Sequence, residues 1–159
     1  VVDEPTVFQF GGKPYQPDNY GSRFLGRVTL RRALAASANV ATVKVAEAVG
    51  YEYVVEIARR AGLKGNLQPT PAVALGAYEA TPLEIAAAYG VFANGGIYTE
   101  PALISMVESP EGVLLYSHVP RQRRAIDPRI AYQQSKFNRG MFWQAMPRSA
   151  SRCGPALTA

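Results

Sequence analysis

Helix start and stop signals follow one another from Thr29 to Gly96, and this run restricts the chain to a fold built on a layer of helices. The expected helices cover residues 30–36, 40–49, 51–61 and 82–93. The last of them has the clearest start, because Thr81-Pro82-Leu83-Glu84 places threonine at the N-cap, proline at the first helical position and glutamate at the third. Asn94-Gly95-Gly96 ends it.

The first two helices are separated by Ser37-Ala38-Asn39, whose polar side chains compete with helical hydrogen bonds. We therefore expect the chain to break there and Asn39 to cap the second helix. A serine at such a break is far more often a cap than a nucleophile, since a nucleophile needs an activating base and Ser37 has no histidine near it in the sequence. Taken alone, the pattern does not identify a catalytic site.

The other segments carry turn and strand signals. Residues 1–28 are rich in glycine, proline, asparagine and aspartate, which predicts a structured loop or an extended lead-in. Residues 103–107 and 113–116 flank a type I turn at 109–112, and this arrangement predicts a β-hairpin. The basic run Arg121–Arg124 is expected on a loop facing solvent, a membrane surface or an anionic polymer. A further helix is expected to begin at Asp127-Pro128.

With 159 residues, 48% of them hydrophobic, the chain has the size of one domain or a piece of one and can form a core. No apolar stretch approaches the ~18 residues that span a bilayer, and the first residues lack the pattern of a signal peptide. We therefore expect a soluble segment. One cysteine, Cys153, and one histidine, His118, cannot build a disulfide framework or a usual zinc site, so we expect no metal or other cofactor.

The net charge of +5 invites a nucleic-acid partner, but its distribution argues against one. Residues 133–159 contain four basic residues and no acid, whereas residues 1–132 contain thirteen basic against twelve acidic residues. The same tail holds the only tryptophan and the only cysteine. We therefore divide the chain into a body, residues 1–132, and an atypical basic tail, residues 133–159, which is expected to be frameshifted or foreign sequence.

A collinear series of motifs resembles the transpeptidase domain of class A penicillin-binding proteins, the bifunctional peptidoglycan synthases of bacteria. The resemblance covers roughly residues 1–132. A chance match would not place so many motifs in the same order. The motifs are Val2-Asp3-Glu4-Pro5, Pro17-x-Asn19-Tyr20, Gly26-x-Val28-Thr29-Leu30-Arg31-x-Ala33-Leu34, Ser37-Ala38-Asn39, Ala74-Leu75-Gly76-Ala77, Glu79-Ala80-Thr81-Pro82-Leu83-Glu84 and Ala88-Tyr89-Gly90-Val91-Phe92-Ala93-Asn94-Gly95-Gly96.

The resemblance implies a fold, a reaction and two site residues. The fold is the α/β serine D,D-transpeptidase or β-lactamase-like domain, here mainly its helical subdomain with a β-hairpin. The family uses Ser-x-x-Lys, Ser-x-Asn and Lys-Thr-Gly to cross-link peptidoglycan stem peptides through a serine acyl-enzyme, which β-lactams also form. By resemblance, catalytic Ser37 relays protons and Asn39 binds the substrate backbone. The parent protein is then expected at the outer face of the cytoplasmic membrane, anchored there and joined to a glycosyltransferase domain.

Two of the three family motifs are missing from the chain. No serine is followed by lysine three positions later, and neither Lys-Thr-Gly nor Lys-Ser-Gly occurs. The family carries these motifs upstream and downstream of the middle one, so we expect a fragment truncated at both ends and inactive by itself. Since the missing strands would cover apolar helix faces, we also expect limited stability.

Three other functions remain open at this point. A D,D-carboxypeptidase or β-lactamase-like enzyme would resolve the acyl-enzyme with water. A non-catalytic penicillin- or peptidoglycan-binding module would need no nucleophile. A nucleic-acid binder would rest only on the charge of residues 133–159.

Overall fold

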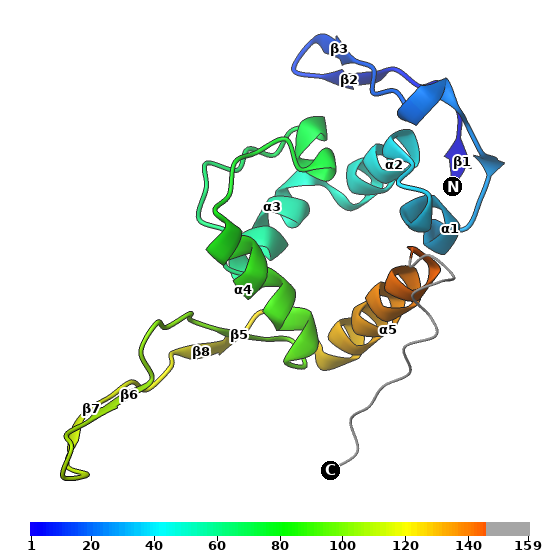
Figure 1. The fold of residues 1–159 in the computed structure, drawn as a ribbon. Coiled ribbons are helices and arrows are strands. Elements are labelled where there is room, and N and C mark those ends of the chain that lie inside the picture. The colour runs from blue at the N-terminus through cyan, green and yellow to red at the C-terminus, as the bar shows by residue number, and fades with distance from the viewer. Residues whose placement is uncertain (146–159) are drawn as a thin grey trace.

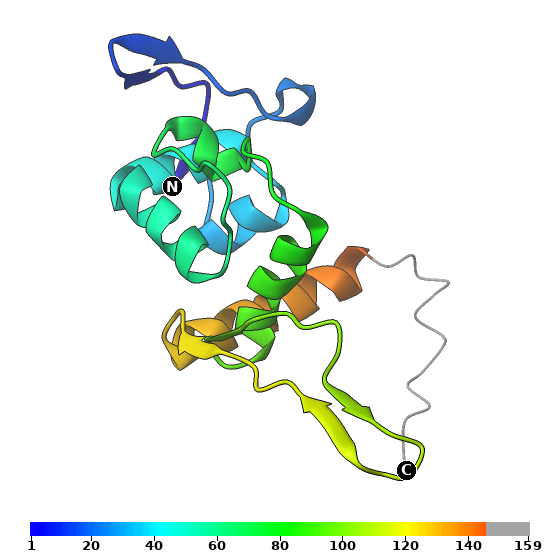
Figure 2. The same cartoon turned by 90° about the vertical axis from the view of Figure 1, so that its left-hand side faces the viewer.

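The computed structural model describes residues 1–145, with the side chains of residues 1–137. This part of the chain forms the helices α1 (Leu30–Ala35), α2 (Asn39–Val49), α3 (Tyr51–Arg60), α4 (Pro82–Ala93) and α5 (Pro128–Ala145), with the short 3-10 helices η1 (Tyr20–Ser22) and η2 (Pro71–Leu75). In Figure 1 the α-helices follow one another around a ring, and the turned view in Figure 2 places α1, α2 and α3 above α5, with α4 between them. The helices expected between residues 30 and 93 are confirmed.

Threonine side chains fix the starts of two helices, as the sequence predicts. Thr29 Oγ1 accepts a hydrogen bond from the backbone N–H of Arg32 at 3.2 Å, which caps α1. Thr81 Oγ1 accepts from the backbone N–H of Glu84 at 3.2 Å, while the Glu84 carboxylate accepts from the backbone N–H of Thr81 at 2.8 Å. This reciprocal capping box satisfies two N–H groups that would otherwise lack partners at the start of α4.

Replacing Thr81 by alanine is expected to lower the free energy of unfolding by about 1 kcal/mol, because the N–H of Glu84 loses its acceptor. Urea denaturation followed by circular dichroism measures the change. Thr81→Ser keeps the hydroxyl and should stay close to the unmodified chain. Equal stability of the alanine and serine variants would contradict a stabilising role for this cap.

The same contacts give α4 a pH dependence. Hydrogen bonds from the backbone and then the side chain of Thr81 hold the pKa of the Glu84 carboxyl below its usual range. A carboxyl whose pKa is lowered by folding stabilises the fold above its ordinary pKa. This contribution is lost as the pH falls through the lowered pKa.

Eight short strands in the described residues form four two-stranded antiparallel sheets. The pairs are β1 (Val2–Asp3) with β4 (Gly26–Arg27), β2 (Phe8–Phe10) with β3 (Lys13–Tyr15), β5 (Ile97–Thr99) with β8 (Gln122–Arg124), and β6 (Met106–Glu108) with β7 (Leu114–Ser117). Two sequence predictions are corrected here. Residues 1–28, expected as a structured loop or an extended lead-in, contain paired strands, and residues 122–124 of the basic run form a strand.

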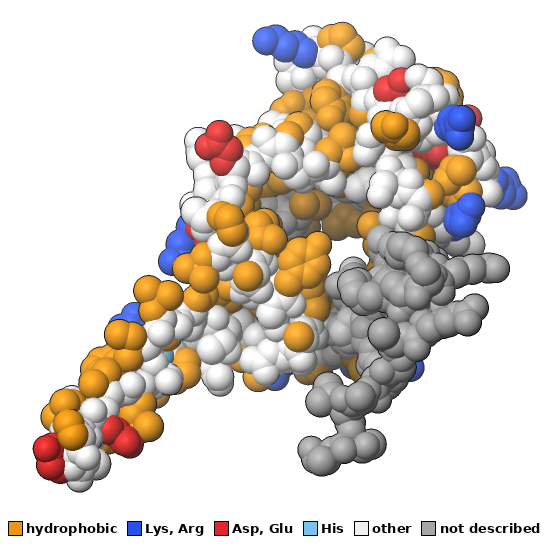
Figure 3. All heavy atoms as spheres, viewed as in Figure 1, with side chains coloured by type: hydrophobic (Ala, Val, Ile, Leu, Met, Phe, Trp, Pro, Cys, Tyr) orange, Lys and Arg blue, Asp and Glu red, His pale blue; other side chains and the backbone are white. Residues whose placement is uncertain are grey.

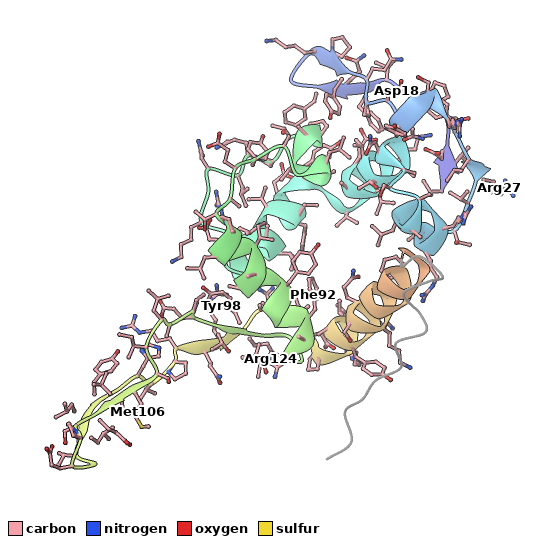
Figure 4. The ribbon with its side chains drawn as sticks, viewed as in Figure 1. Asp18, Arg27, Phe92, Tyr98, Met106 and Arg124 are labelled. Atoms are coloured by element: carbon pink, nitrogen blue, oxygen red, sulfur yellow. The ribbon has the colours of Figure 1, made fainter. Side chains whose placement is uncertain are left out.

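The predicted hairpin is confirmed as β6 and β7, which project away from the helices (Figures 1 and 2). Its turn closes through the backbone N–H of Gly112, which donates to the carbonyl oxygen of Ser109 at 3.0 Å. All residues of both strands are exposed, and apolar side chains cover the arm in Figure 3. Met106, labelled in Figure 4, lies on this arm.

The buried apolar residues form separate clusters. Around α4 and α5, a cluster contains Ala61, Val91, Tyr98, Ala125, Ile126 and Ala131. Under the β2–β3 hairpin, a second contains Phe8, Val40 and Val43, and at the α1–α2 junction a third contains Ala33, Ala38 and Ala41. Many large apolar side chains outside these clusters stay exposed, for example Leu34, Val49 and Tyr53. The described residues therefore share no common core.

Helix α5 starts where Asp127-Pro128 predicts, and it is continuous across the predicted boundary at Gln133. It packs against α4 through the buried Ala131, and the guanidinium of Arg31 lies 5.6 Å from the ring centroid of Phe137. That the residues from about 133 onward are foreign sequence stays a prediction. Residues 146–159 lie outside the described residues.

Candidate functional site

Ser37 lies at the junction of α1 and α2, in the turn that ends α1. The backbone N–H of Ala38 donates to the carbonyl oxygen of Ala33 at 2.9 Å, and that of Ser37 donates to Leu34 at 3.1 Å. These two hydrogen bonds make a Schellman motif, in which the residue after the C-cap adopts the left-handed conformation. Ser37 occupies that position with a φ of 51°.

Helix α3 ends in the same motif but with glycine at the matching position. The N–H of Gly62 donates to Arg59, the N–H of Leu63 donates to Ala58, and Gly62 has a φ of 109°. Glycine adopts a positive φ without steric cost, whereas a residue with a Cβ pays roughly 1–2 kcal/mol. Strained positions of this kind cluster at functional sites. The serine hydroxyl at residue 37 is therefore held at an energetic cost, and its side chain is exposed.

Asn39 does not cap α2, which corrects the sequence prediction. Its side chain is instead directed to an earlier loop, where Nδ2 donates to the carbonyl oxygen of Asp18 at 2.7 Å. The cap is supplied by Asn19, whose Oδ1 accepts from the backbone N–H of Val40 at 3.2 Å. Asp18 is labelled beside α2 in Figure 4. Two neighbouring residues of one loop thus bind the first turn of α2.

Asn19 is held in turn by Asp3, which is fully buried. Asn19 Nδ2 donates to both carboxylate oxygens of Asp3 at 3.0 and 2.9 Å, and the backbone N–H of Leu25 donates to Asp3 Oδ2 at 2.9 Å. Asp3 and Asn19 belong to two motifs of the family resemblance to which the sequence assigned no role. Their signal was present in the sequence, but only the structure links Asp3 through Asn19 to the start of α2.

The described residues give Ser37 no base. No hydrogen bond in this part of the chain involves Ser37 Oγ. Lys44 is the lysine on α2, but its Nζ donates to the carbonyl oxygen of Val2 at 2.9 Å and pairs with Glu4 at 3.2 Å. A serine hydroxyl is a weak nucleophile without an adjacent base. This arrangement can therefore present a hydroxyl and an amide, but it contains no activated nucleophile.

Beside this junction, α1 and α2 form an apolar cavity of about 280 Å³ lined by residues such as Leu30, Leu34, Val45 and Val49. Among the described residues, no three histidine, cysteine, aspartate or glutamate side chains gather as metal ligands. In the same part of the chain, no helix is long and apolar enough to cross a membrane.

Comparison with known proteins identifies this scaffold. Residues 2–142 match the family model described as the penicillin-binding protein transpeptidase domain. The chain belongs to the penicillin-binding protein transpeptidase family. Its fold is accordingly that of the serine D,D-transpeptidases, of which the described residues contain helices and four small sheets. Ser37-Ala38-Asn39 therefore lies within a penicillin-binding transpeptidase sequence.

Relatives in both sequence and structure are penicillin-binding proteins. Penicillin-binding protein 1A of Aquifex aeolicus is 43% identical over 69% of this chain and 15% of its own length. The crystal structure of penicillin-binding protein 1A from Haemophilus influenzae is 35% identical, with a TM-score of 0.69 over 76% of this chain and 18% of that one. Penicillin-binding protein A of Mycobacterium tuberculosis, solved as a penicillin G acyl-enzyme, is 28% identical with a TM-score of 0.74 over 92% of this chain and 39% of that one. This chain thus spans a minor part of each relative.

Proposed function

We propose that this chain is a segment of a class A peptidoglycan D,D-transpeptidase, and that Ser37 and Asn39 form the middle part of its active site. The observation that carries the proposal is a serine held at a strained, exposed turn inside a sequence matched by the transpeptidase family model from residue 2 to residue 142. The strain has a functional reason if the hydroxyl must face a reacting group.

Each side chain would have a distinct task. The nucleophilic serine and its lysine lie outside these residues, since the sequence holds no Ser-x-x-Lys. The Ser37 hydroxyl would accept a proton from the side-chain nitrogen of that lysine and pass its own proton to the amine of the departing D-alanine. The Asn39 amide has one N–H bound to Asp18, so its second N–H and its Oδ1 stay available for the backbone of the stem peptide.

The partners follow from the same proposal. Stem peptides ending in D-alanyl-D-alanine would acylate the nucleophilic serine that lies outside these residues. β-Lactams, which mimic this dipeptide, would acylate the same serine. Support comes from the Mycobacterium tuberculosis relative, which was solved as a penicillin G acyl-enzyme. A parent protein of this class would be anchored in the cytoplasmic membrane with the site on its outer side and would carry a glycosyltransferase domain.

Covalent labelling with a fluorescent penicillin tests the proposal. The natural protein that contains these residues should form one acyl-enzyme per molecule, and peptide mapping should locate the label upstream of residue 1, in a Ser-x-x-Lys sequence. The 159-residue chain alone should stay unlabelled, because it has no such sequence.

Other results would replace this function. A label on Ser37 itself would make that serine the nucleophile and contradict its role as a relay. Reversible binding of penicillin without acylation of the natural protein would favour a binding module. Rapid release of the label by water would favour a carboxypeptidase or β-lactamase-like enzyme.

A further inference from the structure

A second concave site lies away from Ser37, where the end of α3 meets β5 and β8. It has a volume of about 270 Å³ and is lined by the cationic side chains of Arg59, Lys64, Arg121 and Arg123. Glu100 is the acidic residue of the lining, so the site carries a net charge of +3. Tyr98, which is labelled in Figure 4, contributes an aromatic wall.

Arg123 is fixed in this wall by contacts that include no carboxylate. Its guanidinium carbon lies 4.4 Å from the centroid of the Tyr98 ring, a cation–π arrangement. Its nitrogens donate to the carbonyl oxygens of Arg59 and Arg60 at the end of α3. Helix C-termini attract cations, so these contacts explain the position of Arg123. They do not explain why three more cations gather beside it.

The other cations of the site have few acidic partners. In the part of the chain that the structure describes, the ion pairs join Lys44 to Glu4, Arg60 to Glu56 and Arg129 to Asp127, and none includes a cation of this site. The nearby carboxylate of Glu84 is hydrogen-bonded to Thr81 and to the backbone N–H of Lys64, and the charge of Lys64 helps to lower the Glu84 pKa, so Lys64 is the cation of the site with an acidic neighbour of this kind. Like charges that share a small concavity repel one another, and a bound anion would relieve that repulsion.

We propose that this site, formed by Arg59, Lys64, Arg121 and Arg123, binds a phosphate group. A phosphate monoester carries a charge of about −1.5 to −2 at neutral pH and offers several acceptor oxygens, so it matches the net charge of the site better than one carboxylate does. Arginine forks bind such oxygens in pairs. Arg123 contributes its charge rather than a free fork, because both of its terminal nitrogens already donate to carbonyl oxygens. The volume of the site is several times that of one water molecule, which occupies about 30 Å³. A phosphate group and part of the molecule that carries it therefore fit.

Thermal unfolding of the natural protein that contains this chain, in sodium phosphate and in sodium chloride at equal ionic strength, tests the proposal. A ligand that binds only the folded state stabilises it by RT ln(1 + c/Kd), where c is the ligand concentration, so the unfolding midpoint continues to rise with the phosphate concentration above the Kd. Arg121→Ala and Lys64→Ala each remove one exposed cation from the site, and each should weaken the apparent phosphate affinity about threefold to tenfold. Arg27→Ala, an exposed cation on β4, is the matched control and should leave the affinity unchanged.

The control also separates site binding from general salt effects, because any stabilisation by excluded phosphate is the same in all variants. A midpoint that responds equally to phosphate and chloride, or an Arg27→Ala effect as large as that of Arg121→Ala, would overturn the proposal.

The source of the phosphate is decided by a second measurement. The chain is sedimented with phosphatidylcholine vesicles that contain a minor fraction of phosphatidic acid, with and without inorganic phosphate. Binding to these vesicles that inorganic phosphate displaces assigns the site to a lipid headgroup. A phosphate-dependent midpoint without vesicle binding assigns it to a small phosphate ester. If Arg121→Ala and Arg27→Ala weaken vesicle binding equally, the proposal of a specific site is overturned.

Discussion

Replacing Ser37 by alanine in the natural protein that contains this chain is expected to slow peptidoglycan cross-linking about a hundredfold to ten-thousandfold, the usual contribution of a positioned proton-transfer group. The alanine has no hydroxyl to pass a proton to the departing amine. The rate constant for acylation by penicillin and the rate of cross-linking of a stem-peptide substrate measure the loss.

Ser22 provides the matched control, because it is the other described non-glycine residue with a positive φ, at 52° against 51° for Ser37. Its hydroxyl donates to Asp18 Oδ2 at 2.6 Å. Ser22→Ala should keep nearly full activity. An equal loss in both variants would contradict a specific role of the Ser37 hydroxyl.

A glycine at residue 37 separates strain from chemistry. Ser37→Gly removes the Cβ from a left-handed position, so it should raise the free energy of unfolding by up to about 1 kcal/mol while activity is lost. Stability and activity then change in opposite directions. A destabilised glycine variant would contradict the assignment of backbone strain to this turn.

Replacing Asp3 by alanine is expected to lower the free energy of unfolding by about 2–4 kcal/mol, because each buried N–H donor that loses its acceptor costs about 1–3 kcal/mol. The change removes the acceptor of the Leu25 N–H and of one Asn19 N–H, while the amide of Asn19 keeps its hydrogen bond to the carbonyl oxygen of Arg23. It also removes the carboxylate that orients Asn19, which caps α2. Urea denaturation followed by circular dichroism measures the loss.

Glu4 is the control for Asp3, since it is the next residue and its carboxylate is exposed in an ion pair with Lys44. Glu4→Ala should change the free energy of unfolding by less than about 1 kcal/mol, as is usual for surface ion pairs. Similar effects of the two variants would mean that the Asp3–Asn19 network contributes no more than a surface contact.

The helices were predictable because their ends depend on neighbouring residues. The hydroxyl of Thr81 and the carboxylate of Glu84 are three residues apart, so the sequence displays both partners of the capping box. The start of α2 was not predictable in this way. Its cap comes from Asn19, twenty-one residues earlier, and a single sequence does not display such a contact.

The strands and the site follow the same rule. The β6–β7 hairpin was predicted because its turn signal lies between its two strands. The pairing of β5 with β8 was not, because the entire β6–β7 hairpin separates these strands in the sequence. Ser37 was recognised by resemblance, but its left-handed backbone was not, since Schellman turns usually signal themselves by glycine. The cluster of cations was visible only in part, as the run from Arg121 to Arg124.

The separation of the buried clusters determines how the molecule opens. Clusters that share no buried residues can lose protection against hydrogen exchange in separate cooperative units. Thr81 lies at the start of α4, beside the first cluster, whereas Asp3 acts on α2, which carries residues of the second. The two stability variants therefore report on different units, and amide exchange read residue by residue shows which unit each variant opens.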